Sequence, residues 1–195
     1  AKEMGFDAVS VITVEDDKAH YYAGAANFII KLIADRKTLK ILGVQVFGKG
    51  AVDKVVDIVV TAMSMRGTLH DIEDLDLAYA PPFSTAIHPI VHTVNVLFNK
   101  INGALETITP AEYLEGKGNG YAVFDSCSVA TIEGAPYLEL TDINGKLEGY
   151  DLDDRLLLVC NKGKKAYLVQ NRLKYYGYTN TRVLEGGVTF NKVKV

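Results

Sequence analysis

The sequence has few cysteines, no long apolar run and little net charge. Two cysteines in 195 residues are too few for a disulfide framework, so we expect a reducing compartment and a cytoplasmic location. The longest apolar runs span only a few residues, whereas a membrane helix needs about 20, so no membrane partner and no signal peptide are predicted. A net charge of -3 gives no reason to expect binding to nucleic acid.

The composition is that of an ordinary globular protein. Hydrophobic residues make up 48% of the chain and charged residues 23%. The length suits one large domain or two small ones. The chain does not begin with Met, and residues 1–6 are typical of the end of a helix, so we expect a fragment of a longer protein.

The first half of the chain is predicted to contain strands followed by helices. Apolar residues alternate with a period of two from about Ala8, and again over 28–34 and 41–47. A polar turn between the last two segments favours a hairpin. Apolar residues then recur at spacings of three and four over 52–63 and 87–101, which predicts two helices with one buried face each.

The second half is predicted to be a parallel α/β unit. A helix-start signature stands at 109–112, with Thr, Pro and Glu in capping positions. A short strand is expected over 121–124, and the all-apolar segment 156–159 suits a central parallel strand. A helix over 165–176 and a strand over 181–184 follow, and this order implies a right-handed parallel crossover.

These patterns predict a fold class that combines α+β with α/β. Residues 1–107 are expected to form a mixed-sheet domain, with strands first and helices after them. Residues 108–195 are expected to form a smaller parallel α/β domain.

Cys160 begins the loop that joins the apolar strand to the next helix. Ligands of open α/β sheets bind beyond the carboxyl ends of the strands, where helix N–H groups and the helix dipole stabilise an anion. The loop is glycine- and lysine-rich, and its residues are Asn161, Lys162, Gly163, Lys164 and Lys165. The glycine lets N–H groups turn inward and the lysines add positive charge, so a thiolate or persulfide is favoured. An inert buried cysteine beside solvated lysines is an equal alternative from these residues alone.

Two aromatic segments in the first half carry Tyr21 and Tyr79. Residues 20–24 form an aromatic cluster in a turn, and two prolines make residues 77–84 extended and rigid. From the pattern alone, buried tyrosines with satisfied hydroxyl groups are the favoured interpretation.

The second half resembles the rhodanese family. The segments that carry the resemblance are residues 156–167, 173–178 and 183–188, with a C-x-x-G-x-[RK] loop and a later hydrophobic-E-G-G signature. The six-residue loop resembles that of the sulfur-handling members rather than the longer loop of related phosphatases. The resemblance implies that Cys160 carries sulfane sulfur as a persulfide, held by the backbone N–H groups of residues 161–165. Lys165 stands where Arg is usual, which keeps the charge but loses bidentate binding.

The earlier part of the rhodanese resemblance is weaker. Asp125 resembles the Asp that ends an early strand of the family, and Cys127 stands where an Arg is common. The family's G-H-I-P-G-A segment is reduced to residues 132–135. Cys127 also follows the end of a strand and could face Cys160 as a second, resolving thiol. The alternative is an isolated small residue in a loop.

The first half resembles the dimerisation domain of the pyridine nucleotide-disulfide oxidoreductases. The closest branch contains coenzyme A-disulfide reductases, NADH oxidases and persulfide reductases. The string A-Y-A-P-P-F-S at 78–84 is the specific part, although Ala23 replaces a usual Pro and residues 54–57 lack one usual cation. The resemblance implies a homodimer in which Tyr21 and Tyr79 enter the partner's active site and donate hydrogen bonds to a departing thiolate.

His88 and His92 are spaced like ligands on one helix face. No third ligand is evident, so we expect no metal and interpret both as surface or interface histidines.

Together, the resemblances imply the C-terminal part of an FAD- and NAD(P)H-dependent CoA-disulfide or persulfide/polysulfide reductase. Cys160 would pass sulfur to a flavin-side cysteine upstream. The sequence has no G-x-G-x-x-G, so FAD and NAD(P)H are expected to bind outside this chain and no cofactor on it. The expected substrate is a small thiol, a persulfide or a CoA disulfide, with coenzyme A as a further candidate ligand. The alternatives are a non-catalytic dimerisation or binding module with a degenerate rhodanese domain, and a stand-alone sulfurtransferase.

Overall fold

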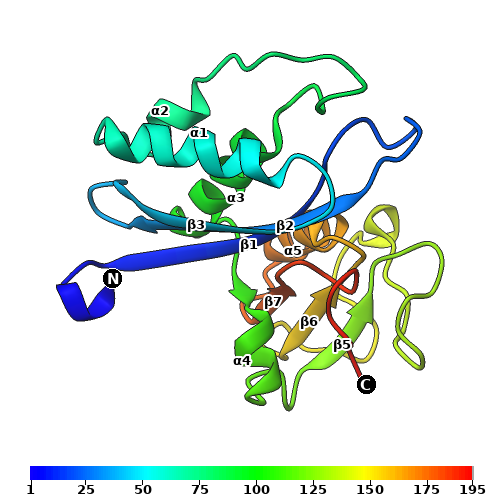
Figure 1. The fold of residues 1–195 in the computed structure, drawn as a ribbon. Helices are drawn as coiled ribbons and strands as arrows, with labels where there is room; N and C mark the ends of the chain where they lie inside the picture. The colour runs from blue at the N-terminus through cyan, green and yellow to red at the C-terminus, as the bar shows by residue number, and fades with distance from the viewer. Residues whose placement is uncertain (195) are drawn as a thin grey trace. The chain divides into compact units, whose positions relative to one another are not determined.

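The computed structural model describes residues 1–194 and divides into two compact units. The first spans Ala1–Asn102 and the second begins at Gly103 (Figure 1). Each has its own hydrophobic core. An antiparallel sheet with helices is followed by a parallel sheet with helices, which confirms the predicted fold class. No helix within residues 1–194 combines the length and the apolar character that crossing a bilayer requires.

The first unit is a three-stranded antiparallel sheet with helices on one face (Figure 1). Its strands pair in the order β1-β2-β3, and β2 and β3 form the predicted hairpin. The strands are β1 (Ala8–Asp16), β2 (Asn27–Asp35) and β3 (Ile41–Gly48). The helices are η1 (Lys2–Met4, a 3-10 turn), α1 (Val52–Ser64), α2 (Leu69–Glu73) and α3 (Pro89–Ile101). Of these, α1 and α3 follow the predicted periodicity, whereas α2 was not predicted.

Alternation along the strands explains why one face of this sheet is covered. Phe28, Ile30 and Leu32 of β2 point to the same side and are completely or almost completely buried. They pack in one cluster with Val59 of α1 and Val94 of α3. The sheet face and the two helix stripes therefore form one core.

The second unit is a four-stranded parallel sheet in the order β4-β7-β6-β5. Its strands are β4 (Thr107–Ile108), β5 (Ala122–Asp125), β6 (Leu156–Val159) and β7 (Thr181–Leu184). Its helices are α4 (Pro110–Leu114), η2 (Leu140–Asp142, a 3-10 turn) and α5 (Lys164–Tyr175). All four residues of β6 are buried between neighbours on both sides, so the prediction of a central parallel strand is confirmed.

The register of β5 and β6 brings their ends to one edge of the sheet. Asp125 is paired with Val159, so the chain leaves both strands at the same level. The residues that follow the two strands, including Cys127 and Cys160, are consequently placed side by side.

Candidate functional site

A cavity of about 400 Å³ lies in the second unit, and both cysteines line it. Cys127 follows β5 and Cys160 follows β6. Lys162, Lys164 and Lys165 also line the cavity, with the last two exposed to solvent. The structure thus brings together two thiols and three cationic side chains at the carboxyl edge of the parallel sheet, where ligands of such sheets bind.

The sulfur of Cys160 is surrounded by backbone donors. The residue is 3% exposed, and its Sγ accepts hydrogen bonds from the N–H of Gly163 at 3.2 Å and of Ala166 at 3.5 Å. Gly163 was among the predicted loop donors, whereas Ala166 was missed. The first-turn N–H groups of a helix lack intrahelical acceptors, and that signal points to Ala166. Negative charge on Cys160 would therefore meet inward-pointing N–H groups at the start of α5.

The conformation of Gly163 makes this arrangement possible. It is the N-cap of α5, with a φ of 95°, in the left-handed region that glycine adopts without strain. The chain therefore reverses direction between Cys160 and the helix. As a result, the first turn of α5 folds back over the sulfur.

Residues 187–189 hold the outer side of the same loop. The carbonyl of Cys160 accepts the N–H of Val188 at 3.0 Å, and the carbonyl of Asn161 accepts the N–H of Thr189 at 3.0 Å. Gly187 has a φ of 57°, and a Cβ there would lie 2.0 Å from the Cys160 oxygen and 2.4 Å from the Asn161 oxygen. The E-G-G signature therefore has a structural reason: the second glycine lets the chain pass against the loop carbonyls.

Asp125 organises the loop that carries Cys127. Its buried carboxylate accepts the N–H of Cys127 at 2.9 Å and the N–H of Thr131 at 2.6 Å. It also accepts the Thr131 hydroxyl and the N–H of Ile132. Burial opposes its ionisation, but these donors outweigh burial and hold the pKa of Asp125 below its ordinary value.

Cys127 contacts the Cys160 loop directly. Its Sγ accepts the N–H of Asn161 at 3.2 Å, so this N–H bonds to Cys127 and not to Cys160 as predicted. The residue is 6% exposed, and burial raises the pKa of the Cys127 thiol above its ordinary value. Cys127 and Cys160 thus line one cavity as free thiols, and the resolving role of Cys127 stays a prediction.

Tyr21 and Tyr79 lie on exposed segments of the first unit. Asp17 closes the loop between β1 and β2 through two hydrogen bonds with Ala26, and Tyr21, 72% exposed, lies within that loop. Tyr79 is half exposed and lies between α2 and α3. Within residues 1–194 neither hydroxyl has a hydrogen-bond partner. The expectation of buried, satisfied tyrosines is therefore wrong for both.

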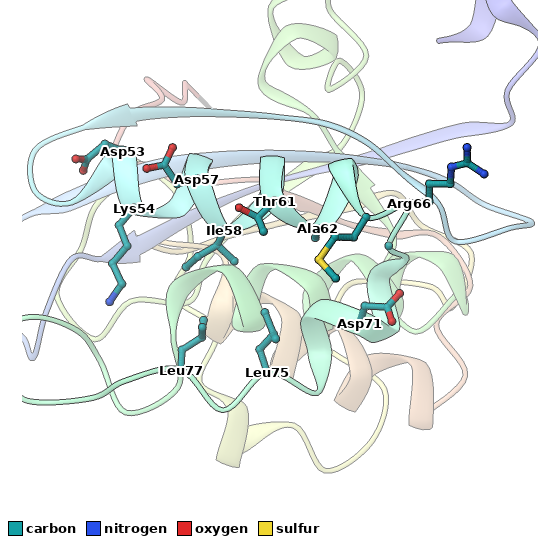
Figure 2. Close-up of a pocket in the computed structure, with 12 residues that line it drawn as sticks. Asp53, Lys54, Asp57, Ile58, Thr61, Ala62, Arg66, Asp71, Leu75 and Leu77 are labelled. Carbon is teal, nitrogen blue, oxygen red and sulfur yellow. The ribbon is translucent and has the colours of Figure 1, made fainter.

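A larger cavity, of about 810 Å³, lies in the first unit along α1 and α2 (Figure 2). Figure 2 shows Ile58, Leu75 and Leu77 on its apolar part, with charged residues such as Asp53 and Arg66 toward its ends. Its lining residues include no cysteine. This cavity is the larger of the two, but both thiols line the smaller one.

The two histidines have separate structural roles. His88 is the N-cap of α3 and accepts the N–H of Ile90 at 3.3 Å, while His92 pairs with Glu15 at 2.8 Å. His88 is buried, so the prediction of a surface position is wrong for it. Burial, helped by the charge of Lys54, lowers the pKa of His88 to about 4. Among the described residues, no three His, Cys, Asp or Glu side chains gather as metal ligands.

The matches to protein families agree with the division of the chain into two units. Residues 1–90 match the pyridine nucleotide-disulphide oxidoreductase dimerisation domain, and residues 101–189 match the rhodanese-like domain. One matched region lies in each half of the chain, which confirms both predicted resemblances.

Named relatives are oxidoreductases. Over 98 residues the chain is 34% identical to the NAD(P)H coenzyme A polysulfide/persulfide reductase of Pyrococcus horikoshii. This alignment covers 50% of this chain and 22% of the relative. It is 32% identical over 84 residues to a coenzyme A disulfide reductase of Staphylococcus aureus, covering 43% of this chain and 18% of that protein. The chain thus spans about a fifth of the curated relatives that it matches.

Two solved structures match nearly the whole chain. A NAD-dependent persulfide reductase from A. fulgidus aligns with a TM-score of 0.87 and 32% identity, over 97% of this chain and 35% of that one. Reduced CoADR-RHD from Bacillus anthracis aligns with a TM-score of 0.82 and 28% identity, over 95% of this chain and 34% of that one. The first neighbour is a reductase by name, and this chain covers about a third of the length of each neighbour.

Proposed function

We propose that this chain is the C-terminal part of a CoA-disulfide or persulfide/polysulfide reductase, in which Cys160 carries sulfane sulfur. The observation that carries the proposal is the pair of N–H groups, from Gly163 and Ala166, directed at the Cys160 sulfur beside a lysine-lined cavity. Such donors stabilise a thiolate or a terminal persulfide sulfur. The loaded cysteine would then present its sulfur to a flavin-side cysteine elsewhere in the parent protein.

The charges around the cavity fit an anionic sulfur donor. Lys162, Lys164 and Lys165 raise the local concentration of polysulfide, of a thiol persulfide or of a phosphate-bearing thiol such as coenzyme A. Lys165 would act as a point charge, because it lacks the planar fork of an arginine.

The first unit would pair two subunits of the parent and contribute to the reductive site. The hydroxyls of Tyr21 and Tyr79 are exposed and unpaired within residues 1–194, so each can donate to a thiolate supplied by the partner subunit. FAD and NAD(P)H would supply reducing equivalents when bound by other parts of the parent, since this chain carries no G-x-G-x-x-G. Two free cysteines fit a cytoplasmic parent.

Two single-thiol variants test the sulfur-carrier role. Cys127→Ser leaves Cys160 as the sole thiol, and Cys160→Ser leaves Cys127 as the sole thiol. Each is treated anaerobically with one equivalent of polysulfide, and its intact mass is measured before and after addition of cyanide. We expect Cys127→Ser to gain one sulfur atom that cyanide removes as thiocyanate, and Cys160→Ser to gain none.

The test also discriminates the alternatives. A folded Cys127→Ser chain whose reduced Cys160 takes up no sulfur would reject the carrier role and leave a dimerisation or binding module. Uptake by Cys160→Ser instead would transfer the carrier role to Cys127.

A further inference from the structure

The proposed carriage of sulfur by Cys160 gives no role to Cys127, the second thiol of the cavity. Cys127 is nevertheless buried at the same cavity, and its sulfur accepts the N–H of Asn161, the residue next to Cys160. That hydrogen bond is 3.2 Å long, and the Asn161 nitrogen is two covalent bonds from the Cys160 Cα. The Cys127 sulfur therefore lies within roughly 6 Å of that Cα.

The loops that carry the two thiols are fixed independently. Asp125 holds the Cys127 loop through bonds to the N–H groups of Cys127, Thr131 and Ile132. Residues 187–189 hold the Cys160 loop from the opposite side. Two sets of hydrogen bonds thus keep both cysteines at the same cavity, where rotation of a cysteine about its Cα–Cβ bond changes the separation of the two sulfurs.

The geometry points to Cys127 as a resolving thiol that releases the sulfur carried by Cys160 as sulfide. This inference rests on the proposed function, because it requires a persulfide on Cys160. The Cys127 sulfur attacks the inner sulfur of that persulfide. The persulfide S–S bond breaks, a Cys127–Cys160 disulfide forms, and the outer sulfur leaves with the thiol proton as H₂S.

The step balances without an external redox partner. The outer sulfur gains two electrons and becomes sulfide, and the two cysteine sulfurs lose two electrons as they join. The Asn161 N–H stabilises the thiolate form of Cys127, which is the form that attacks, and the lysines of the cavity attract the departing hydrosulfide. The chain would thereby reduce one sulfane sulfur per dithiol.

The test compares the wild-type chain with Cys127→Ser under anaerobic conditions. A serine hydroxyl can accept the same Asn161 N–H, so this variant removes the thiol while keeping the loop contact. Each protein is fully reduced, freed of reductant and treated with one equivalent of polysulfide. Intact mass and released sulfide are then followed together.

We expect the wild type to lose the mass of two hydrogens and release its carried sulfur as sulfide, while Cys127→Ser retains one added sulfur. Peptide mapping should locate a Cys127–Cys160 disulfide, and dithiothreitol should restore the starting mass. Retention of the added sulfur by both proteins would overturn the inference and leave the proposed function intact. No uptake by Cys127→Ser would reject the proposed function, and the inference with it, even if the wild type formed a disulfide.

Discussion

Gly187→Ala should destabilise the second unit and disturb the Cys160 loop. The new Cβ would lie 2.0 Å from the Cys160 carbonyl oxygen and 2.4 Å from the Asn161 oxygen, which forces the backbones apart. Those two oxygens accept three hydrogen bonds, from the N–H of Val188, the N–H of Thr189 and the Thr189 hydroxyl. The substitution therefore affects both the turn and its contact with the loop.

The expected magnitude follows from two contributions. A non-glycine residue at the observed φ of 57° costs about 1 kcal/mol. Loss of the three hydrogen bonds costs about 1 kcal/mol each, so the total is about 4 kcal/mol. Gly120→Ala is the matched control, because Gly120 has a φ of 78° but no atom within 4 Å of an added Cβ. It should cost only about 1 kcal/mol.

Alkylation of the cysteines provides an assay that reports the second unit alone. Both thiols belong to that unit, and Cys127 is buried beneath the loop that carries Cys160. A short pulse of iodoacetamide can reach Cys160 in folded molecules, but at increasing urea it modifies Cys127 as well only in unfolded ones. Mass spectrometry counts doubly modified chains, and the midpoints give the free energy of unfolding. Equal losses for Gly187→Ala and Gly120→Ala would refute the argument from close approach.

Two further predictions concern buried ionisable groups. His88 has a pKa of about 4 in the folded chain, so the unfolded chain binds a proton first as the pH falls below about 6.5. The first unit should therefore lose on the order of 2–3 kcal/mol between pH 6.5 and 4, and His88→Asn, which retains a capping acceptor, should lose less. Hydrogen exchange of α3 amides, corrected for intrinsic rates, measures this, and identical losses would contradict it. Asp125→Asn should destabilise the second unit by about 1–3 kcal/mol and speed alkylation of Cys127, because one amide oxygen cannot replace the carboxylate's acceptors. Unchanged alkylation kinetics would show that Asp125 does not position that loop.

Strands and helices that are specified by neighbouring residues could be predicted from local sequence patterns. The four apolar residues of β6 and the capping residues around Thr109 specify a buried strand and a helix start without reference to the rest of the chain. Helix α2 was not predicted because its five residues are too few to show a helical periodicity. The capping box of Thr68 and Asp71 was the available signal.

Features that depend on distant packing could not be predicted in the same way. The spacing of His88 and His92 suggested one exposed face, but packing buries His88 at the start of α3. The donors around Cys160 depend on the positive φ of Gly163, and the N–H of Asn161 bonds to Cys127 rather than to Cys160. The residues of the site could be predicted from the sequence. Which backbone N–H group bonds to which of the two sulfurs is shown only by the structure.

The contact between residues 187–189 and the Cys160 loop also sets a lower limit on the length of a polypeptide that keeps this site intact. A chain trimmed before Gly187 would keep every residue around the sulfur yet leave the outer carbonyls of the loop to water. The match to the rhodanese-like domain ends at residue 189, the last residue that donates to this loop. Among the described residues of the second unit, the matched region thus ends with the segment that bonds directly to the thiol loop, while Asn191 just beyond it holds the carbonyls of Glu185 and Gly187.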